Sequence, residues 1–120
     1  MKIAITGGAG FIASHLVPFL AHSGFDHLKV VDIREPAYLG QVPCAFYRRD
    51  ISKKNEWADL LKDVEVVFHL AWASTPESST KDPVGDVNAS LVPTLQLLAQ
   101  CVSHRVRRVV FISTGGAIYG

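Results

Sequence analysis

Thr6-Gly-Gly-Ala-Gly-Phe-Ile-Ala13 is the stretch that decides the fold of this 120-residue chain. An apolar run, Lys2-Ile-Ala-Ile-Thr6, comes before it, and a helical pattern of apolar residues follows. Within the stretch, Gly7, Gly10 and Ala13 give a G-x-x-G-x-x-A spacing. A strand, a glycine-rich turn and a helix in this order bring backbone N–H groups to a helix N-terminus, where a pyrophosphate binds. The stretch therefore predicts a dinucleotide-binding unit, and a glycine turn without a ligand is the alternative.

Asp32 supports a dinucleotide ligand because it ends the second predicted strand, about 20 residues after the glycines. An acid at this place accepts hydrogen bonds from the adenosine ribose hydroxyls. Its charge would repel the 2′-phosphate of NADP, so the sequence favours NAD as the cofactor, and the nearby Arg34 weakens that preference. A solvated acid at a strand end is the alternative interpretation of Asp32.

The rest of the chain alternates strand patterns with helix patterns. Strands are expected at residues 2–6, 27–33, 44–49, 65–70 and 109–112, helices at 10–23, 52–61 and 84–103, and loops at 34–43 and 72–82. Ser52 is the expected N-cap of the second helix, and Pro93 is expected to kink or break the third. The alternation predicts an α/β fold, a Rossmann-type doubly wound parallel sheet that is truncated after the fifth strand.

We expect residues 1–120 to form the N-terminal part of an NAD(P)-binding Rossmann domain, with the substrate domain absent and an unpaired apolar edge at the fifth strand. A net charge of +1 argues against nucleic acid and anionic membranes as partners. No apolar run reaches the roughly 18 residues of a membrane span, and no secretory pattern is present, so a cytoplasmic location is expected. Two distant cysteines and five histidines without ligand spacing predict neither a disulfide nor a metal site.

Further blocks follow the glycine loop in a fixed order. They are Val30-Val-Asp32, Asp50-Ile51, His69-Leu-Ala-Trp-Ala73, the helical segment 82–98, and Val109-Val-Phe-Ile-Ser-Thr-Gly-Gly-Ala-Ile-Tyr-Gly120. Together with the loop they resemble the extended short-chain dehydrogenase/reductase superfamily, in particular its NAD-dependent nucleotide-sugar epimerases and dehydratases. The UDP-glucose 4-epimerase type is the most similar, and the resemblance covers essentially the whole chain.

The resemblance implies a set of cofactor-binding residues at the carboxyl ends of the strands. The set is Gly7, Gly10, Phe11, Ile12, Asp32, Asp50, Ile51, Leu70, Ala71, Ala73 and Ser90. Asp50 and Ile51 would flank the adenine ring of NAD. Ala71 and Ala73 would border the pyrophosphate and the nicotinamide ribose.

Some positions depart from the family pattern. Ser90 stands where the family carries an asparagine, and Pro93 stands where it carries a glycine, so the nicotinamide side of the site differs. Trp72 stands where a smaller residue is expected, so its ring would change the wall of the site. His69 is expected to pack in its strand rather than to act as a catalytic base.

A hydroxyl after the fifth strand would bond the reacting sugar hydroxyl, and Thr114 is favoured over Ser113 for this catalytic role. The superfamily's base, a Tyr-x-x-x-Lys pair, is missing, because none of the three tyrosines has a lysine four residues later. We therefore expect this chain to be inactive by itself. Gly115 and Gly116 stand where the dehydratases carry an Asp-Glu pair, which favours an epimerase.

The resemblance thus implies an NAD-dependent nucleotide-sugar 4-epimerase that oxidises a substrate, expected to be a UDP-sugar, transiently to a 4-keto sugar. A 4,6-dehydratase or a reductase of the same superfamily is one alternative. A non-catalytic dinucleotide-binding sensor or scaffold module is an alternative of another class. The predicted helix at 84–103 is the expected surface for a homodimer. Arg105, Arg107 and Arg108 are expected to form a solvated cluster at its end rather than a nucleic-acid site.

Overall fold

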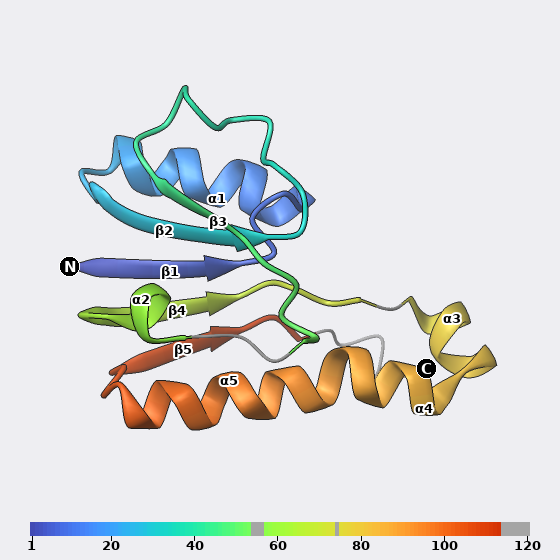
Figure 1. The fold of residues 1–120 in the computed structure, drawn as a ribbon. Helices are drawn as coiled ribbons and strands as arrows, with labels where there is room; N and C mark the ends of the chain where they lie inside the picture. Colours follow the sequence, from blue (N-terminus) through green and yellow to red (C-terminus); the bar gives the residue numbers. More distant parts are fainter. Residues whose placement is uncertain (54–56, 74, 114–120) are drawn as a thin grey trace.

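The computed structural model describes residues 1–53, 57–73 and 75–113 of the chain. Five parallel strands form one sheet in the order β3-β2-β1-β4-β5 (Figure 1). They are β1 (Lys2–Thr6), β2 (His27–Asp32), β3 (Ala45–Arg48), β4 (Val64–His69) and β5 (Arg108–Phe111). The predicted α/β class and parallel sheet are confirmed, and each of these strands falls within about two residues of its predicted range.

The strand order places a crevice at the carboxyl ends of β1 and β4. The chain moves outward from β1 through β2 to β3 and then returns to the other side of β1 as β4. The connections that follow β1 and β4 therefore leave in opposite directions, and ligands bind at such a switch point in open α/β sheets. Thr6, the last residue of β1, is paired with Val31 on one side and His69 on the other.

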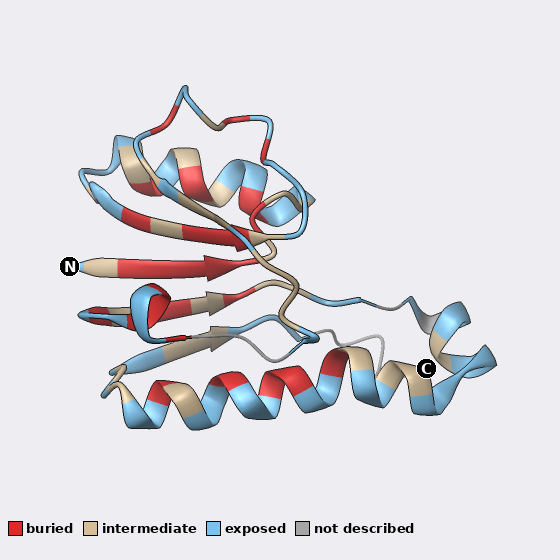
Figure 2. Ribbon diagram, in the orientation of Figure 1, coloured by how far each residue is buried: buried red, intermediate tan, exposed pale blue. Residues whose placement is uncertain are grey.

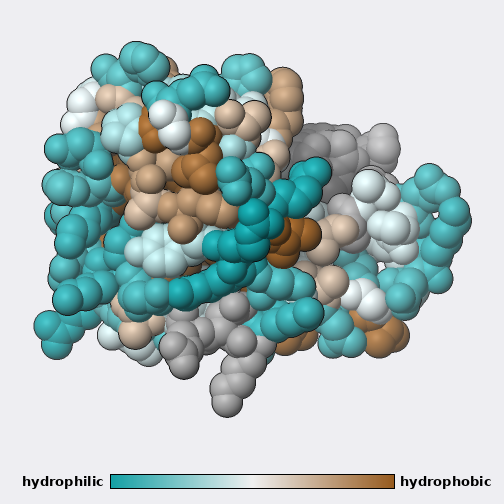
Figure 3. Space-filling view, turned by 45° about the horizontal axis from the view of Figure 1, so that its top comes forward, coloured by the Kyte–Doolittle hydropathy of each residue, from teal (hydrophilic) through white to brown (hydrophobic). Residues whose placement is uncertain are grey.

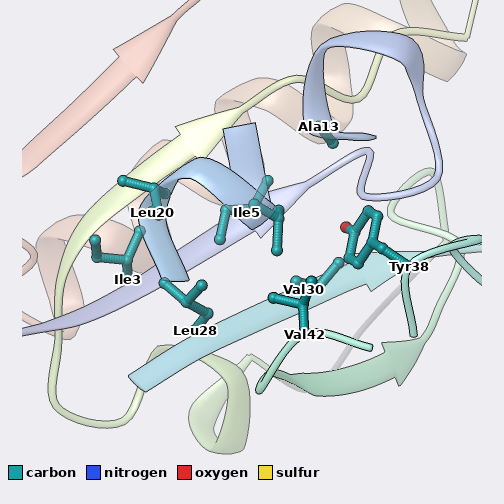
Figure 4. Close-up of a cluster of buried hydrophobic side chains, with 9 residues drawn as sticks. Ile3, Ile5, Ala13, Leu20, Leu28, Val30, Tyr38 and Val42 are labelled. Atoms are coloured by element: carbon teal, nitrogen blue, oxygen red, sulfur yellow. The ribbon is translucent and has the colours of Figure 1, made fainter. Parts of the chain in front are cut away.

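One face of the sheet is covered by α1 (Phe11–His22), as Figure 1 shows. Its buried residues are Ala13, Val17 and Leu20, which pack with Ile5 and Val30 in one hydrophobic cluster (Figure 4). Ala13 is 1% exposed, so the third small residue of the predicted spacing lies where helix and strand approach closely. The helix ends before Gly24, whose φ of +89° is a conformation that favours glycine.

The opposite face is covered by α2 (Ala58–Leu61) and by a long helical segment made of α4 (Pro83–Asp86), η1 (Val87–Leu91) and α5 (Val92–Ser103). Figure 2 shows the buried stripe of α5 turned toward the sheet. Leu97 and Cys101 of this stripe pack with Leu61, Val64 and Val67 in a second hydrophobic cluster. Both faces of the sheet are therefore covered in part, as a doubly wound fold requires.

Pro93 does not break the long helix in two, so that part of the expectation was wrong. It is the second residue of α5, and the five residues of η1 that precede α5 form a π-helical segment. Proline has no N–H to bond the fourth residue before it, and its ring crowds that carbonyl. The wider π turn accommodates the missing hydrogen bond, so the helical segment continues without an interruption.

Two local predictions were wrong. Ser52 does not cap a helix, because α2 begins at Ala58, and the N–H and hydroxyl of Ser52 donate to Asp50 Oδ1 at 2.9 and 2.6 Å. Residues 72–82 are not entirely loop, because they contain α3 (Pro76–Lys81). Thr75 caps this helix: its Oγ1 accepts from the N–H of Ser78, and the Ser78 hydroxyl accepts from the N–H of Thr75.

Apolar side chains are also exposed. On the face drawn in Figure 3, hydrophobic patches interrupt a largely hydrophilic surface. In the part of the chain that the structure describes, β5 pairs with β4 alone, and Phe111 at its end is about half exposed. None of the helices in the described ranges is both long and apolar enough to cross a bilayer.

Candidate functional site

A cavity of about 350 Å³ lies at the carboxyl ends of β1 to β4, in the crevice defined by the strand order. It is lined by Gly7, Gly10, Val31, Asp32, Ile33, Arg34, Arg49, Asp50, Ile51, Ser52, Leu70, Ala71, Trp72, Ala73 and Ala89. Most of the predicted cofactor-binding set lies on this wall; Phe11, Ile12 and Ser90 do not. Residues from five separate segments of sequence therefore meet here because the carboxyl ends of parallel strands share one edge of the sheet.

Gly7 begins the glycine loop in a conformation that few other residues adopt. Its φ is +73°, and a Cβ atom added to it would lie 2.7 Å from the backbone nitrogen of Ala71. The loop after β1 thus passes directly against the loop after β4. A glycine is needed at this position because of its positive φ and because the backbone of Ala71 leaves no room for a Cβ atom.

The hydrogen bonds of the glycine loop leave particular N–H groups without acceptors. The N–H groups of Gly7 and Gly8 donate to the carbonyl oxygen of Val31 at 3.0 and 3.2 Å, and that of Gly10 donates to Gly7. Within the described residues, the N–H groups of Phe11, Ile12 and Ala13, in the first turn of α1, form no hydrogen bond.

That first turn also lacks the groups that normally complete a helix N-terminus. The N-cap, Gly10, has no side chain to accept a hydrogen bond, and the first turn carries no acidic residue. Orphan N–H groups and the positive end of the helix dipole favour a bound anion. The side chains of Phe11 and Ile12 are 81% and 47% exposed. Because these side chains are apolar, any contribution of Phe11 and Ile12 to binding an anion comes from their backbone N–H groups.

Asp32 is held in place by two backbone N–H groups. Its Oδ2 accepts from Ala9 and its Oδ1 accepts from Arg34, both at 2.9 Å. A carboxylate accepts about four hydrogen bonds, so both oxygens can still accept from a ligand. Because Asp32 lines the cavity and is anchored to the glycine loop, its negative charge has a fixed place in the wall.

Asp50 and Ile51 follow β3 and form the far end of the cavity wall. Hydrogen bonds from the Ser52 hydroxyl and N–H hold the pKa of the Asp50 carboxyl below its ordinary value, so this group is ionised at neutral pH. Ile51 is partly buried against the cluster that contains Trp57 and Leu60. This end of the cavity therefore combines an apolar side chain with a hydrogen-bond acceptor, which suits an aromatic heterocycle that carries an amine.

A line of buried hydrogen bonds runs beneath the cavity through His69. Thr6 Oγ1 lies 2.7 Å from His69 Nδ1, and His69 Nε2 lies 2.8 Å from Thr94 Oγ1. The Thr94 hydroxyl donates to the carbonyl oxygen of Ser90 at 2.7 Å, so it accepts from Nε2–H. His69 therefore carries its proton on Nε2 and accepts at Nδ1 from Thr6, which itself accepts from the N–H of Ala71 at 3.3 Å.

These bonds assign His69 a structural part. Burial lowers the pKa of His69, so the ring is neutral at physiological pH. The ring is 2% exposed, does not line the cavity, and has both of its nitrogens occupied. His69 thus packs in β4, and this geometry gives it no access to a substrate.

Ser90 lies behind the cavity rather than on its wall. It is 4% exposed, and its Oγ accepts a long hydrogen bond of 3.4 Å from the N–H of Ala73. Its neighbour Ala89 lines the cavity instead, and sequence reasoning missed it. The predicted Ser90 therefore supports the loop after β4, while that loop and Ala89 of η1 form the wall itself.

The remaining predicted residues, Ser113 and Thr114, follow β5 in the sequence. Ser113 is exposed and does not line the cavity, and Thr114 lies outside the described residues.

Trp72 does form part of the wall, as predicted, and its ring meets Phe111 edge to face with centroids 6.0 Å apart. Within the described ranges, no group of three or more His, Cys, Asp or Glu side chains is placed to hold a metal ion.

Other wall residues were also missed, most clearly Arg49, which follows β3. Its guanidinium forms two bonds to the carboxylate of Asp59, one of them 2.9 Å long. The position of Arg49 on the wall could be predicted in part, because Arg49 adjoins the predicted Asp50 at a strand end. Its pairing with Asp59 could not be predicted, since that contact depends on how α2 packs in the fold.

Comparison with known proteins identifies relatives along the whole chain. Residues 3–120 match the model of the NAD dependent epimerase/dehydratase family. A UDP-glucose 4-epimerase of Halalkalibacterium halodurans is 33% identical over 124 residues, which are 100% of this chain and 36% of that protein. The chain therefore spans well under half of the length of this relative.

Solved structures give the same result. MoeE5 in complex with UDP-glucose and NAD superposes with a TM-score of 0.87 and 32% identity, over 100% of this chain and 38% of that chain. The UDP-glucose 4-epimerase of Thermus thermophilus in complex with NAD superposes with a TM-score of 0.84 and 36% identity, over 100% of this chain and 40% of that chain.

Proposed function

Because the chain belongs to the NAD-dependent epimerase/dehydratase family, we propose that it binds NAD in the cavity at the carboxyl ends of β1 to β4. The observation that carries this proposal is the first turn of α1, where three consecutive N–H groups lack acceptors beside the wall of that cavity. A pyrophosphate supplies the acceptors that these groups lack, and its charge is favourable at the N-terminus of a helix.

The rest of NAD is assigned by the chemistry of the two ends of the cavity. Asp32 would accept from the adenosine ribose, and Asp50 and Ile51 would border the adenine. The small residues Ala71 and Ala73 would leave room for the nicotinamide ribose. NAD, when bound, supplies hydride uptake and return, while the protein supplies binding and orientation.

The fixed charge of Asp32 supports NAD rather than NADP. Its carboxylate cannot turn away from a 2′-phosphate without losing its bonds to Ala9 and Arg34. Arg34 and Arg49 also line the cavity, but Arg49 is already paired with Asp59. Arg34 weakens the preference for NAD, while the fixed carboxylate of Asp32 repels a second phosphate at the adenosine ribose.

For the whole protein we propose a nucleotide-sugar 4-epimerase that acts on a UDP-sugar. The similarity to UDP-glucose 4-epimerases supports this, as does the glycine pair at the positions of the dehydratase acids, Gly115 and Gly116. A catalytic hydroxyl from Thr114 or Ser113 would contact the reacting sugar. A 4,6-dehydratase or a reductase is the alternative within the family.

The 120 residues contain no Tyr-x-x-x-Lys pair, so we propose that this chain binds the cofactor without turning over substrate. Incubation of the pure chain with NAD and UDP-glucose should leave the absorbance of NADH and the sugar composition unchanged. Formation of UDP-galactose in this experiment would contradict the proposal. A hydride-transfer signal with any other nucleotide sugar would contradict it as well.

Calorimetric titration with NAD and with NADP tests the proposed cofactor site. We expect NAD to bind at least tenfold more tightly than NADP, about 1.4 kcal/mol of preference. In Asp32→Asn the amide nitrogen would face one of two N–H donors, so NAD should bind more weakly while the preference over NADP shrinks. Absence of NAD binding to the wild-type chain would contradict the proposal.

A further inference from the structure

Both polar atoms of one peptide unit in the glycine loop are held by side chains. The Tyr38 hydroxyl donates to the carbonyl oxygen of Gly8 at 2.7 Å. The N–H of Ala9 donates to Asp32 Oδ2 at 2.9 Å. The carbonyl of Gly8 and the N–H of Ala9 belong to the same planar peptide, so these two bonds fix the orientation of the whole unit.

The surroundings of Tyr38 hold its hydroxyl in this position. The side chain is 7% exposed and lies in the hydrophobic cluster with Val30 and Val42, as Figure 4 shows. Burial raises the pKa of the phenol far above its ordinary value, so the hydroxyl stays protonated and donates. A Cβ atom added to Gly8 would lie 2.0 Å from Val30 Cγ1, so a glycine is needed for the loop to approach this cluster.

The orientation of this peptide matters because reversing it would be unfavourable. The reversed unit would place the carbonyl oxygen of Gly8 against the Asp32 carboxylate, two acceptors facing each other. The Tyr38 oxygen could accept from the N–H of Ala9 in the reversed unit, so the Asp32 carboxylate selects the orientation and the bond from Tyr38 holds the selected peptide in place. In the observed orientation, the peptide leads through Gly10 into the first turn of α1, whose N–H groups stay open.

We propose that Tyr38 is a positioning residue of the dinucleotide site. Its hydroxyl, acting with Asp32 on the Gly8–Ala9 peptide, preforms the glycine loop for a pyrophosphate. Tyr38 does not line the cavity, so its effect on a ligand passes through the loop. This proposal rests on the proposed function. It adds Tyr38, which lies in the connection between β2 and β3 and outside the glycine motif.

Tyr38→Phe tests the proposal because it removes the hydroxyl and keeps the ring in the cluster. Titrations with NAD, ADP-ribose and adenosine separate loss of the pyrophosphate contact from loss of the adenosine contact. We expect the affinities for NAD and ADP-ribose to fall roughly fivefold, the equivalent of one lost neutral hydrogen bond. The affinity for adenosine, which has no phosphate, should stay within the error of the wild-type value.

Leu20→Val is the matched control, because Leu20 belongs to the same cluster and its aliphatic side chain cannot hydrogen-bond to the loop. It should lower stability and leave the affinity for NAD unchanged. The proposal would be overturned if Tyr38→Phe lost as much affinity for adenosine as for ADP-ribose. It would also be overturned if Tyr38→Phe and Leu20→Val lost the same affinity for NAD. An unchanged affinity in Tyr38→Phe would overturn it too. A wild-type chain that binds no NAD would instead overturn the proposed function.

Discussion

At the scale of single residues, Gly7 is the most constrained position of the candidate site. Gly7→Ala would combine an unfavourable φ with a Cβ contact of 2.7 Å to the backbone of Ala71. Gly24→Ala is the matched control, because it also has a positive φ but meets nothing within 4 Å. We expect Gly24→Ala to cost about 1 kcal/mol of unfolding free energy, and Gly7→Ala about 3 kcal/mol together with loss of NAD binding.

Urea unfolding and calorimetric titration of both variants check this expectation. Gly24 lies outside the cavity wall, so Gly24→Ala should bind NAD as the wild type does. Wild-type NAD affinity in Gly7→Ala would show that the contact between the two loops is not needed by the site.

The charge state of His69 gives a second expectation at this scale. Above pH 6.5 the ring is neutral in the folded and the unfolded chain. Below that value the unfolded chain binds a proton that the folded chain binds only at lower pH, so the free energy of unfolding falls. Urea unfolding as a function of pH should show a steeper loss below pH 6.5 for the wild type than for His69→Gln. Equal slopes would contradict a buried, neutral His69.

Acidic groups affect a separate pH window. Hydrogen bonds hold the carboxyl pKa values of Asp50 and Asp59 below their ordinary 3.8. Their contribution to stability is present above pH 3.8 and is lost as the pH falls through the folded values. Loss of stability that begins near pH 6.5 therefore cannot come from these two groups.

The residues of the site were predictable where they depend on local sequence. Gly7, Asp32 and Ala71 lie at strand ends, and the carboxyl ends of neighbouring parallel strands meet at one edge. Tyr38 was not recognised, because its contact with Gly8 spans 30 residues and no local pattern indicates it. Ser90 was expected to bind the cofactor, but its buried Oγ accepts from the N–H of Ala73 and the residue does not line the cavity.

At the scale of the elements, the hydrogen bonds from Thr6 through His69 to Thr94 join β1, β4 and α5. Thr94→Val removes the hydroxyl that accepts from His69 Nε2–H and leaves that donor buried without a partner. We expect it to cost about 1–3 kcal/mol of unfolding free energy, while Thr94→Ser keeps the hydroxyl and costs less. Urea unfolding of both variants measures the difference. Equal losses in the Val and Ser variants would contradict the account, because keeping the hydroxyl in Thr94→Ser would then bring no advantage over losing it in Thr94→Val.

The elements themselves were predictable to different degrees. Strands and long helices have apolar periodicities that the sequence displays, and the structure confirms them. The short helix α3 has no apolar face, and its only local signal is a capping threonine followed by a proline. The continuity of the helical segment across Pro93 depends on a π turn, which a rule about proline alone does not anticipate.

At the scale of the whole molecule, the long helical segment presents an apolar face to solvent. Val84, Leu95 and Val102 are 70%, 56% and 79% exposed, and Val87, Leu91 and Leu98 are partly exposed beside them. An apolar face of this kind is typical of a contact between subunits. We therefore propose that the protein forms a homodimer through this segment. A monomer in solution at all concentrations would contradict this proposal.

Sedimentation velocity tests the proposed dimer. Leu95→Lys places a charge at the middle of the face, and we expect it to shift a wild-type dimer to monomers. Phe19→Lys, which adds the same charge at an exposed apolar residue of α1 on the opposite face of the sheet, is the control and should leave the dimer intact. A Leu95→Lys variant that stays dimeric would place the contact elsewhere.

The central claim is that the N–H groups in the first turn of α1 bind the pyrophosphate of NAD. The most direct measurement is an NMR titration of the ¹⁵N-labelled chain with NAD, followed through its backbone amide resonances. We expect the amides of Phe11 and Ile12 to shift most, with smaller shifts at Asp32 and Ala71 along the cavity wall. Shifts that leave Phe11 and Ile12 unchanged and concentrate on α5 or at the end of β5 would contradict the claim.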